Sequence, residues 1–161
     1  MHFLNILAFV PLLRYHSRTK HIKATKKREK FNENYNTSLN IVAYIDSLDG
    51  INGKTEDDIK AILARARAIS DEAARRILIK GKATLTLEAA KVLSREGVYL
   101  FGNESQTVGP EGSPRAVHLE LLGADMILLE GARLGDVPEG DYLLFAAPIS
   151  LGGAEGAPCR A

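Results

Sequence analysis

The sequence contains no tryptophan, one cysteine and no long hydrophobic run. A single cysteine, Cys159, permits neither an internal disulfide nor a cysteine-rich zinc site. This fits a reducing compartment, and we expect a cytoplasmic protein. No run approaches the roughly 18 apolar residues that a membrane-spanning helix requires. The apolar stretch Phe3–Leu13 has the length of a signal-peptide core, but no basic residue precedes it and no small-residue cleavage site follows it, so we expect no signal peptide.

Basic residues are concentrated at the start of the chain. Residues 1–30 carry eight Lys and Arg against one acid, whereas the remainder carries thirteen against nineteen. A mildly acidic body argues against nucleic acid as a partner. We expect residues 1–30 to be a basic, poorly ordered arm, because like charges repel and apolar positions do not recur at a regular spacing. Two alternatives for this arm remain open, a membrane-surface anchor and a contact with a partner subunit. The anchor is disfavoured because the apolar and basic residues are consecutive and do not lie on opposite faces of a helix.

The other 131 residues have the pattern of one α/β domain, over residues 31–161. Helical periodicity alternates with short apolar segments, which is typical of helices that cover a largely buried sheet. Strands are expected at Asn40–Ile45, Arg76–Lys80, Val98–Phe101, Met126–Leu129 and Tyr142–Ala147.

Three helices are expected between these strands. Thr55 can cap the first helix, since acids follow it in the first turn. Thr86 can cap the second helix, and Gly97 can end it in the left-handed conformation that glycine tolerates. The third helix is expected at Arg115–Leu122, closed by Gly123.

His118 and Glu130 are the candidate site residues. His118 lies on the third predicted helix, and Glu130 follows the next predicted strand twelve residues later. A helix that turns back into an adjacent strand can bring the two side chains together. Imidazole and carboxylate are suitable ligands for zinc or manganese. A structural hydrogen bond, or no contact at all, remains open from the spacing alone.

The segment between residues 102 and 114 is rich in turn formers and could line a site at the carboxyl end of a sheet. It lacks the spaced glycines and the lysine of a phosphate-binding loop. No serine has the sequence context of a nucleophile, and no base is identifiable for Cys159.

Several motifs occur together in the second half of the chain. These are TLTLEAAKVLSREGVYLFGNESQTVGPEG, a histidine followed twelve residues later by a glutamate, VPEGDY, and GAPCRA at the end. In this order they resemble the C-terminal part of the cyclase family of metal-dependent hydrolases, which includes bacterial kynurenine formamidases (arylformamidases). The resemblance covers about Lys80–Ala161 and weakens toward Asn40.

The resemblance implies a shortened form of the swivelling β/β/α fold, with a mixed sheet and covering helices. It also implies that His118 and Glu130 bind a catalytic metal, zinc or manganese, which activates water for amide hydrolysis of N-formylkynurenine-type substrates in tryptophan catabolism. The residues that perform catalysis and bind the substrate are not identifiable from the sequence.

The chain departs from the family in the segment that would carry the other ligands. The family has an upstream His-x-Gly-Thr-His-x-Asp motif, whereas this chain has no histidine between Phe31 and Lys80. Asp46 and Asp49 are possible oxygen ligands, although aspartate in turns more often makes local hydrogen bonds. We therefore expect weak metal binding and an impaired enzyme, with a non-catalytic relative or fragment that acts as an oligomerisation or interaction module as the alternative. Because the missing segment should leave a strand edge or core surface uncovered, we also expect a homo-oligomer.

Overall fold

The computed structural model describes residues 7–11, 41–45, 54–135, 137–149, 151–152, 154 and 156–161, the first two ranges by their backbone alone. The elements in chain order are β1 (Leu7–Pro11), β2 (Ile41–Ile45), α2 (Glu56–Ile69), the 3-10 helix η1 (Ala73–Arg75), β3 (Arg76–Ile79), α3 (Leu87–Arg95), β4 (Leu100–Asn103), α4 (Arg115–Gly123), β5 (Ile127–Leu129), β6 (Gly140–Leu143), β7 (Ala147–Pro148) and β8 (Gly156–Arg160).

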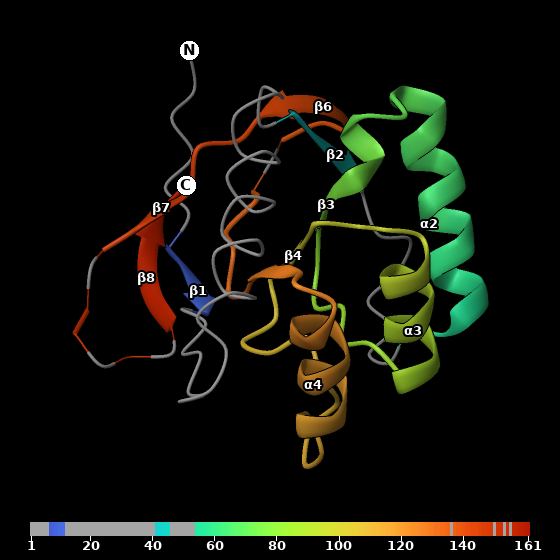
Figure 1. The fold of residues 1–161 in the computed structure, drawn as a ribbon. Coiled ribbons are helices and arrows are strands. Elements are labelled where there is room, and N and C mark those ends of the chain that lie inside the picture. The colour runs from blue at the N-terminus through green and yellow to red at the C-terminus, as the bar shows by residue number, and fades with distance from the viewer. Residues whose placement is uncertain are drawn as a thin grey trace, which may run out of the picture.

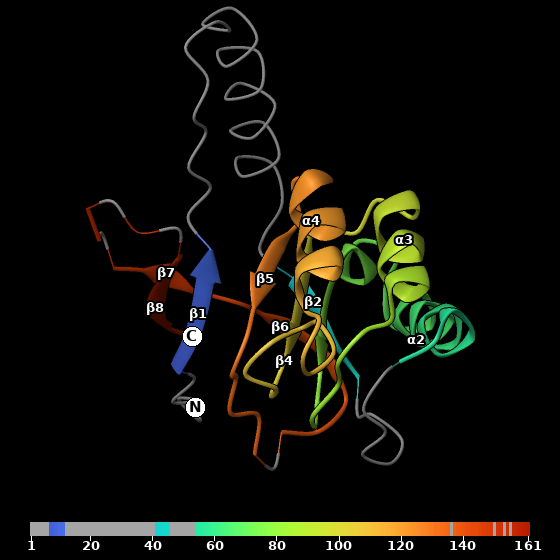
Figure 2. The same ribbon diagram turned by 90° about the horizontal axis from the view of Figure 1, so that it is seen from below.

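A mixed five-stranded sheet forms the centre of the fold. Its order is β5-β4-β3-β2-β6, in which β6 is antiparallel to β2 and the other neighbours are parallel. Helices α2, α3 and α4 connect successive parallel strands and cover one face of this sheet (Figure 1). A second, antiparallel sheet of order β1-β8-β7 lies on the opposite side (Figure 2). The predicted α/β fold, with a mixed sheet and covering helices, is confirmed.

The parallel strands β3, β4 and β5 are largely buried, because each face of the sheet packs against another layer. Alternate side chains belong to two different apolar clusters, since successive residues of a strand point to opposite faces. The cluster on the helix side includes Ile77, Phe101 and Leu128. The cluster toward the small sheet includes Leu78, Leu100, Leu129 and, from β8, Cys159.

The helices begin where the sequence predicts. The Thr55 hydroxyl accepts the backbone N–H of Asp58, and the Asp58 carboxylate accepts the backbone N–H of Thr55, which completes a capping box. The Thr86 hydroxyl accepts the N–H of Ala89 at the start of α3. Gly97 follows α3 with φ +69°, as predicted for its role in ending the helix.

The predicted strand at Tyr142–Ala147 is wrong in its extent. The strand β6 ends at Leu143, and β7, which starts at Ala147, belongs to the other sheet. An apolar run was interpreted as one strand, but the chain leaves one sheet and enters the other within it. The strand predicted at Val98–Phe101 is shifted, because β4 begins at Leu100 and continues to Asn103.

Strands β1 and β8 were not predicted. They pair antiparallel, from Leu7 opposite Arg160 to Pro11 opposite Gly156. Strand β1 lies within the segment predicted to be a poorly ordered arm, and the basic residues of that segment lie outside the described residues. Within the described part of the chain, no helix is long and apolar enough to cross a membrane.

Candidate functional site

Helix α4 holds the ring of His118 in a defined orientation. The helix begins after Pro114, whose carbonyl oxygen accepts the backbone N–H of His118 at 3.1 Å. The ring Nδ1 of His118 lies 2.9 Å from the same oxygen. Because a carbonyl oxygen can only accept, Nδ1 carries a hydrogen and donates it. The other ring nitrogen, Nε2, therefore points away from the backbone of α4.

Nε2 of His118 faces the carboxylate of Glu130. The Nε2–Oε1 distance is 3.0 Å, and the Glu130 side chain is 10% exposed against 26% for His118. Glu130 Oε1 also accepts the backbone N–H of Val108 at 2.7 Å. The predicted meeting of His118 and Glu130 is confirmed, and their role as metal ligands stays a prediction.

The carboxylate shifts the acid–base equilibrium of the histidine. The hydrogen bond to Glu130 raises the pKa of His118 above its ordinary value. The hydrogen bond to the Pro114 carbonyl and the negative charge of Glu130 act in the same direction, whereas burial opposes them. A metal ion at Nε2 would therefore compete with a proton that this environment favours.

The loop after β4 also contacts the pair of His118 and Glu130. Val108 is fully buried, and its carbonyl oxygen accepts the N–H of Leu85 at 2.7 Å. Gly109 packs so closely on Pro114 that a Cβ at this position would lie 2.5 Å from the Cα of Pro114. The loop predicted to line a site thus ties the start of α4 to the carboxylate of Glu130.

Two buried polar atoms lie in the segment beside Glu130. Gly102 pairs with Leu129 in the register of β4 and β5, so that Asn103 and Glu130 follow on adjacent strands. Asn103 is fully buried, and its Nδ2 donates to the carbonyl of Ala83. Among the described residues, neither Asn103 Oδ1 nor the hydroxyl of Ser105 has a hydrogen-bond partner. Buried polar atoms of this kind are rare and often mark a site that binds water, an ion or a ligand.

Glu104, in the same loop, has a structural role. The Glu104 carboxylate accepts the backbone N–H groups of Gly81 at 2.7 Å and Leu134 at 2.9 Å, so it joins the loops that follow β3 and β5. Asp46 and Asp49, considered as oxygen ligands, lie outside the described residues. Within the described ranges, no group of three or more His, Cys, Asp or Glu side chains could hold a metal ion.

The chemistry of the donor set fits a metal ion held by two protein ligands. A neutral imidazole that donates Nδ1–H to a backbone carbonyl presents its Nε2 lone pair, which is the usual arrangement of a metal-binding histidine. Glu130 supplies a carboxylate beside it. A catalytic zinc normally has three protein ligands, so the described residues fit a weakly held ion.

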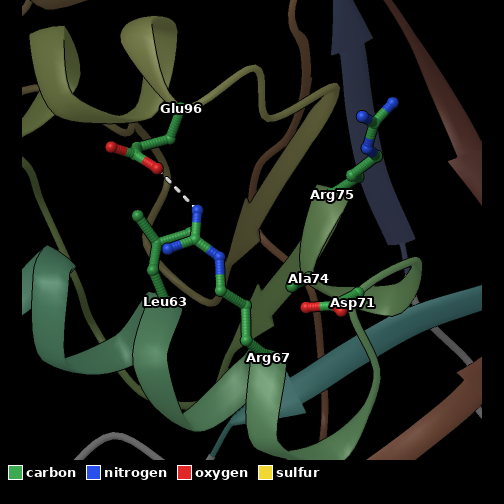
Figure 3. A pocket seen from close by; sticks show the side chains of 6 residues that line it. All are labelled: Leu63, Arg67, Asp71, Ala74, Arg75 and Glu96. Carbon is green, nitrogen blue, oxygen red and sulfur yellow. Dashed lines mark hydrogen bonds and ion pairs between the residues drawn. The ribbon is translucent and has the colours of Figure 1, made fainter.

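A cavity of about 250 Å³ lies elsewhere, among the C-terminal ends of α2 and α3 and the helix η1 (Figure 3). Two of its four charged side chains, Arg67 and Glu96, form an ion pair with each other. Arg67 Nη2 lies 2.5 Å from Glu96 Oε2, and Arg75 donates to the hydroxyl of Tyr99. Neither His118 nor Glu130 lines this cavity, so it forms no part of the candidate site.

About half of the chain is similar to kynurenine formamidases. The enzyme of that name from Sphingopyxis alaskensis is 40% identical over 86 residues, which are 51% of this chain and 41% of the relative. The one from Erythrobacter litoralis is 37% identical over 78 residues, which are 48% of this chain and 36% of the relative. The chain thus matches well under half the length of these relatives. No family model matches it.

Solved structures of two proteins described as metal-dependent hydrolases share the fold. A potential metal-dependent hydrolase with cyclase activity has a TM-score of 0.67 and 22% identity, over 95% of this chain and 75% of that one. A predicted metal-dependent hydrolase from Bacillus stearothermophilus has a TM-score of 0.68 and 22% identity, over 95% of this chain and 73% of that one. The resemblance to cyclase-type hydrolases, and to kynurenine formamidases in particular, is confirmed.

Proposed function

We propose that this chain is an impaired metal-dependent hydrolase of the kynurenine formamidase type. The observation that carries the proposal is the contact of His118 Nε2 with Glu130 Oε1 at 3.0 Å, in a chain about half of which is similar to kynurenine formamidases. The substrate class proposed is a small amide such as N-formylkynurenine. The reducing cytoplasm is the compartment we propose, since a single cysteine permits no internal disulfide.

His118 and Glu130 would hold the metal ion, zinc or manganese. A metal ion in this place would polarise the scissile carbonyl and lower the pKa of water. The chain itself supplies orientation. Pro114 accepts the Nδ1–H of His118, and the backbone N–H of Val108 donates to Glu130 Oε1, so the fold orients both side chains.

Impairment follows from the residues that would complete the site. No histidine other than His118 occurs between Phe31 and Ala161, so the motif that supplies most ligands in the family is absent there. Two ligands leave the ion weakly held. No second histidine is available from that part of the chain to transfer protons during amide cleavage.

Calorimetric titration with Zn²⁺ and Mn²⁺ tests the metal site, together with a formamidase assay on N-formylkynurenine. We expect weak binding by the wild type, loss of that binding in His118→Ala, and negligible turnover in both. His21→Ala, which changes a histidine of the basic segment, is the matched control and should bind metal as the wild type does.

Two outcomes would contradict the proposal in different ways. Tight stoichiometric binding, with turnover that His118→Ala removes, would show that other residues complete an active site. Weak binding that His118→Ala leaves unchanged would show that His118 and Glu130 form a structural ion pair only.

A second candidate function is a non-catalytic association module. The observation that favours it is a group of exposed apolar side chains between residues 142 and 151. The homo-oligomer expected from the sequence belongs to this proposal as well.

A further inference from the structure

Asn103 holds a buried amide oxygen that has no hydrogen-bond partner among the described residues. The Nδ2 group of the same amide donates to the carbonyl oxygen of Ala83. A carbonyl oxygen can only accept, so the amide cannot be turned over, and Oδ1 is the atom that stays unpaired. An unpaired buried acceptor destabilises a protein unless a molecule or an ion binds to it.

The register of the sheet places Asn103 next to Glu130. Gly102 pairs with Leu129 in the parallel strands β4 and β5, so Asn103 and Glu130 are the next residues along each strand. The carbonyl of Asn103 accepts the N–H of Ala132 at 2.9 Å, which keeps the two segments together beyond the paired residues. Neighbouring strands lie about 4.8 Å apart. Asn103 and Glu130 are therefore side by side at the carboxyl end of the parallel strands.

Both side chains belong to the face of the sheet that the helices cover. Residues two apart in a strand share a face. Phe101, two residues before Asn103, and Leu128, two residues before Glu130, both lie in the helix-side cluster. The contact of Glu130 with His118 on α4 agrees with this assignment. The buried amide is thus on the same side of the sheet as the candidate metal ligands.

The amide is oriented with its nitrogen away from Glu130. Strand β4 lies between β3 and β5 in the sheet. Ala83, which accepts from Nδ2, belongs to the segment after β3, whereas Glu130 directly follows β5. Because the oxygen and the nitrogen of a planar amide diverge, Oδ1 is directed away from the β3 side. Within the described ranges, the hydrogen bonds of the Glu130 carboxylate are made by Oε1, so Oε2 retains its capacity as a ligand.

We infer that the amide oxygen of Asn103 binds the same metal ion as His118 and Glu130, as its third protein ligand. This inference rests on the proposed function, which supplies the ion. Amide oxygens are ordinary ligands of divalent cations, and imidazole and carboxylate bind zinc and manganese. The absence of a group of three His, Cys, Asp or Glu in the described ranges does not bear on it, because Asn103 is none of these residue types.

The charge of this donor set keeps the ion weakly held. The amide of Asn103 is neutral, so Glu130 supplies the one negative charge of the three ligands. Cation affinity rises with the number of charged ligands. Asn103→Asp would keep an oxygen at this position and add a second negative charge, whereas Asn103→Leu would supply neither. Both substitutions remove the donor to Ala83, so the loss of that hydrogen bond is common to them and the oxygen is the difference.

Calorimetric titration of the full chain with Zn²⁺ and with Mn²⁺ compares these two variants with the wild type. We expect Asn103→Leu to bind about tenfold more weakly and Asn103→Asp about tenfold more tightly, which is the order of change seen when groups around a metal ion are replaced. Gln106→Leu is the matched control, because it changes an exposed amide of the same loop and should bind as the wild type does. Circular dichroism shows whether each variant has kept its fold.

NMR of the wild type gives a second measurement that does not depend on any variant. Zn²⁺ should shift the side-chain N–H signals of Asn103 and the ring signals of His118 with one midpoint, and should leave the side-chain amide of Gln106 unchanged. An Asn103 amide that does not shift while the His118 ring does would overturn the inference and leave the proposed function intact.

The calorimetric outcomes separate the two hypotheses as well. If Asn103→Asp binds no more tightly than Asn103→Leu, while His118→Ala loses the ion, the inference is wrong and the proposed metal site stands. If His118→Ala binds the ion as the wild type does, the proposed function itself fails.

Discussion

His118 Nε2 lies 3.0 Å from Glu130 Oε1, although twelve residues and a change from helix to strand separate them. The other ring nitrogen faces the carbonyl of Pro114 at 2.9 Å. Both nitrogens thus face hydrogen-bond acceptors. A neutral imidazole has one N–H and can donate to only one of these acceptors, whereas the imidazolium has two and can donate to both. The contact therefore favours the charged histidine when no metal ion is bound.

The first prediction concerns this equilibrium. In the presence of a chelator, NMR titration of the His118 ring should give a midpoint above the ordinary pKa of about 6.5. Glu130→Gln should move the midpoint down, because it removes the carboxylate whose hydrogen bond is the largest cause of the shift. A midpoint that is equal in the two proteins would show that Glu130 does not control His118.

The same shift links stability to pH. A histidine whose pKa is raised in the folded state stabilises the fold fully below its unfolded pKa, and this stabilisation is lost as the pH rises through the folded pKa. The difference in unfolding free energy between wild type and Glu130→Gln should therefore be largest in mild acid and should shrink toward alkaline pH. Urea denaturation at several pH values measures it. A difference that grows with pH would contradict the assignment.

The second prediction compares two glycines in open space. A Cβ at Gly97 or at Gly123 would meet no atom within 4 Å, but only Gly97 has a positive φ, +69°. Gly97→Ala should reduce the unfolding free energy by about 1 kcal/mol, because an alanine is strained in the left-handed region. Gly123→Ala should raise it by about 0.5–1 kcal/mol, since Gly123 is a helical residue of α4. Equal effects would show that backbone conformation does not decide the outcome.

The sequence predicted those parts of the fold that depend on local pattern. The three helices and their caps follow from apolar periodicity and from Thr55, Thr86 and Gly97. The contact of His118 with Glu130 was predictable because a short helix-to-strand connection limits where the two side chains can lie. In each case the determining residues are near one another in the chain.

Strand pairing between the two ends of the chain was beyond such reasoning. Leu7 pairs with Arg160, and no local pattern reports a contact across that separation. The run from Tyr142 was interpreted as one strand because apolar residues are typical of strands, whereas Leu143 and Phe145 point away from the core. The backbone N–H of Val108 was missed as a support for Glu130, because backbone groups leave no signal in the side-chain pattern.

The last prediction concerns the buried polar atoms beside Glu130. The hydroxyl of Ser105 is buried and, within the described residues, has no hydrogen-bond partner. No described protein group replaces the hydrogen bond that this hydroxyl makes to water in the unfolded chain, so Ser105→Ala should raise the unfolding free energy by about 1 kcal/mol. Asn103→Ala should instead lower it by about 1 kcal/mol or more, because Nδ2 of Asn103 donates to Ala83 and its loss leaves that carbonyl unpaired.

Ser70→Ala is the matched control, since the hydroxyl of Ser70 accepts the N–H of Ala73 at 3.2 Å and its removal should destabilise the protein. Urea denaturation measures the unfolding free energy of all three variants and of the wild type. The comparison requires that the slope of this free energy against urea concentration is the same in each. If Ser105→Ala destabilises the protein as Ser70→Ala does, the hydroxyl of Ser105 has a partner in solution. Ser105 adjoins Glu130, since the carbonyl of Ser105 accepts the N–H of Gly131 at 2.7 Å. In that case the partner of the Ser105 hydroxyl would be a water or ligand bound beside the Glu130 carboxylate. A bridging water or ligand can satisfy a buried hydroxyl that no protein group reaches.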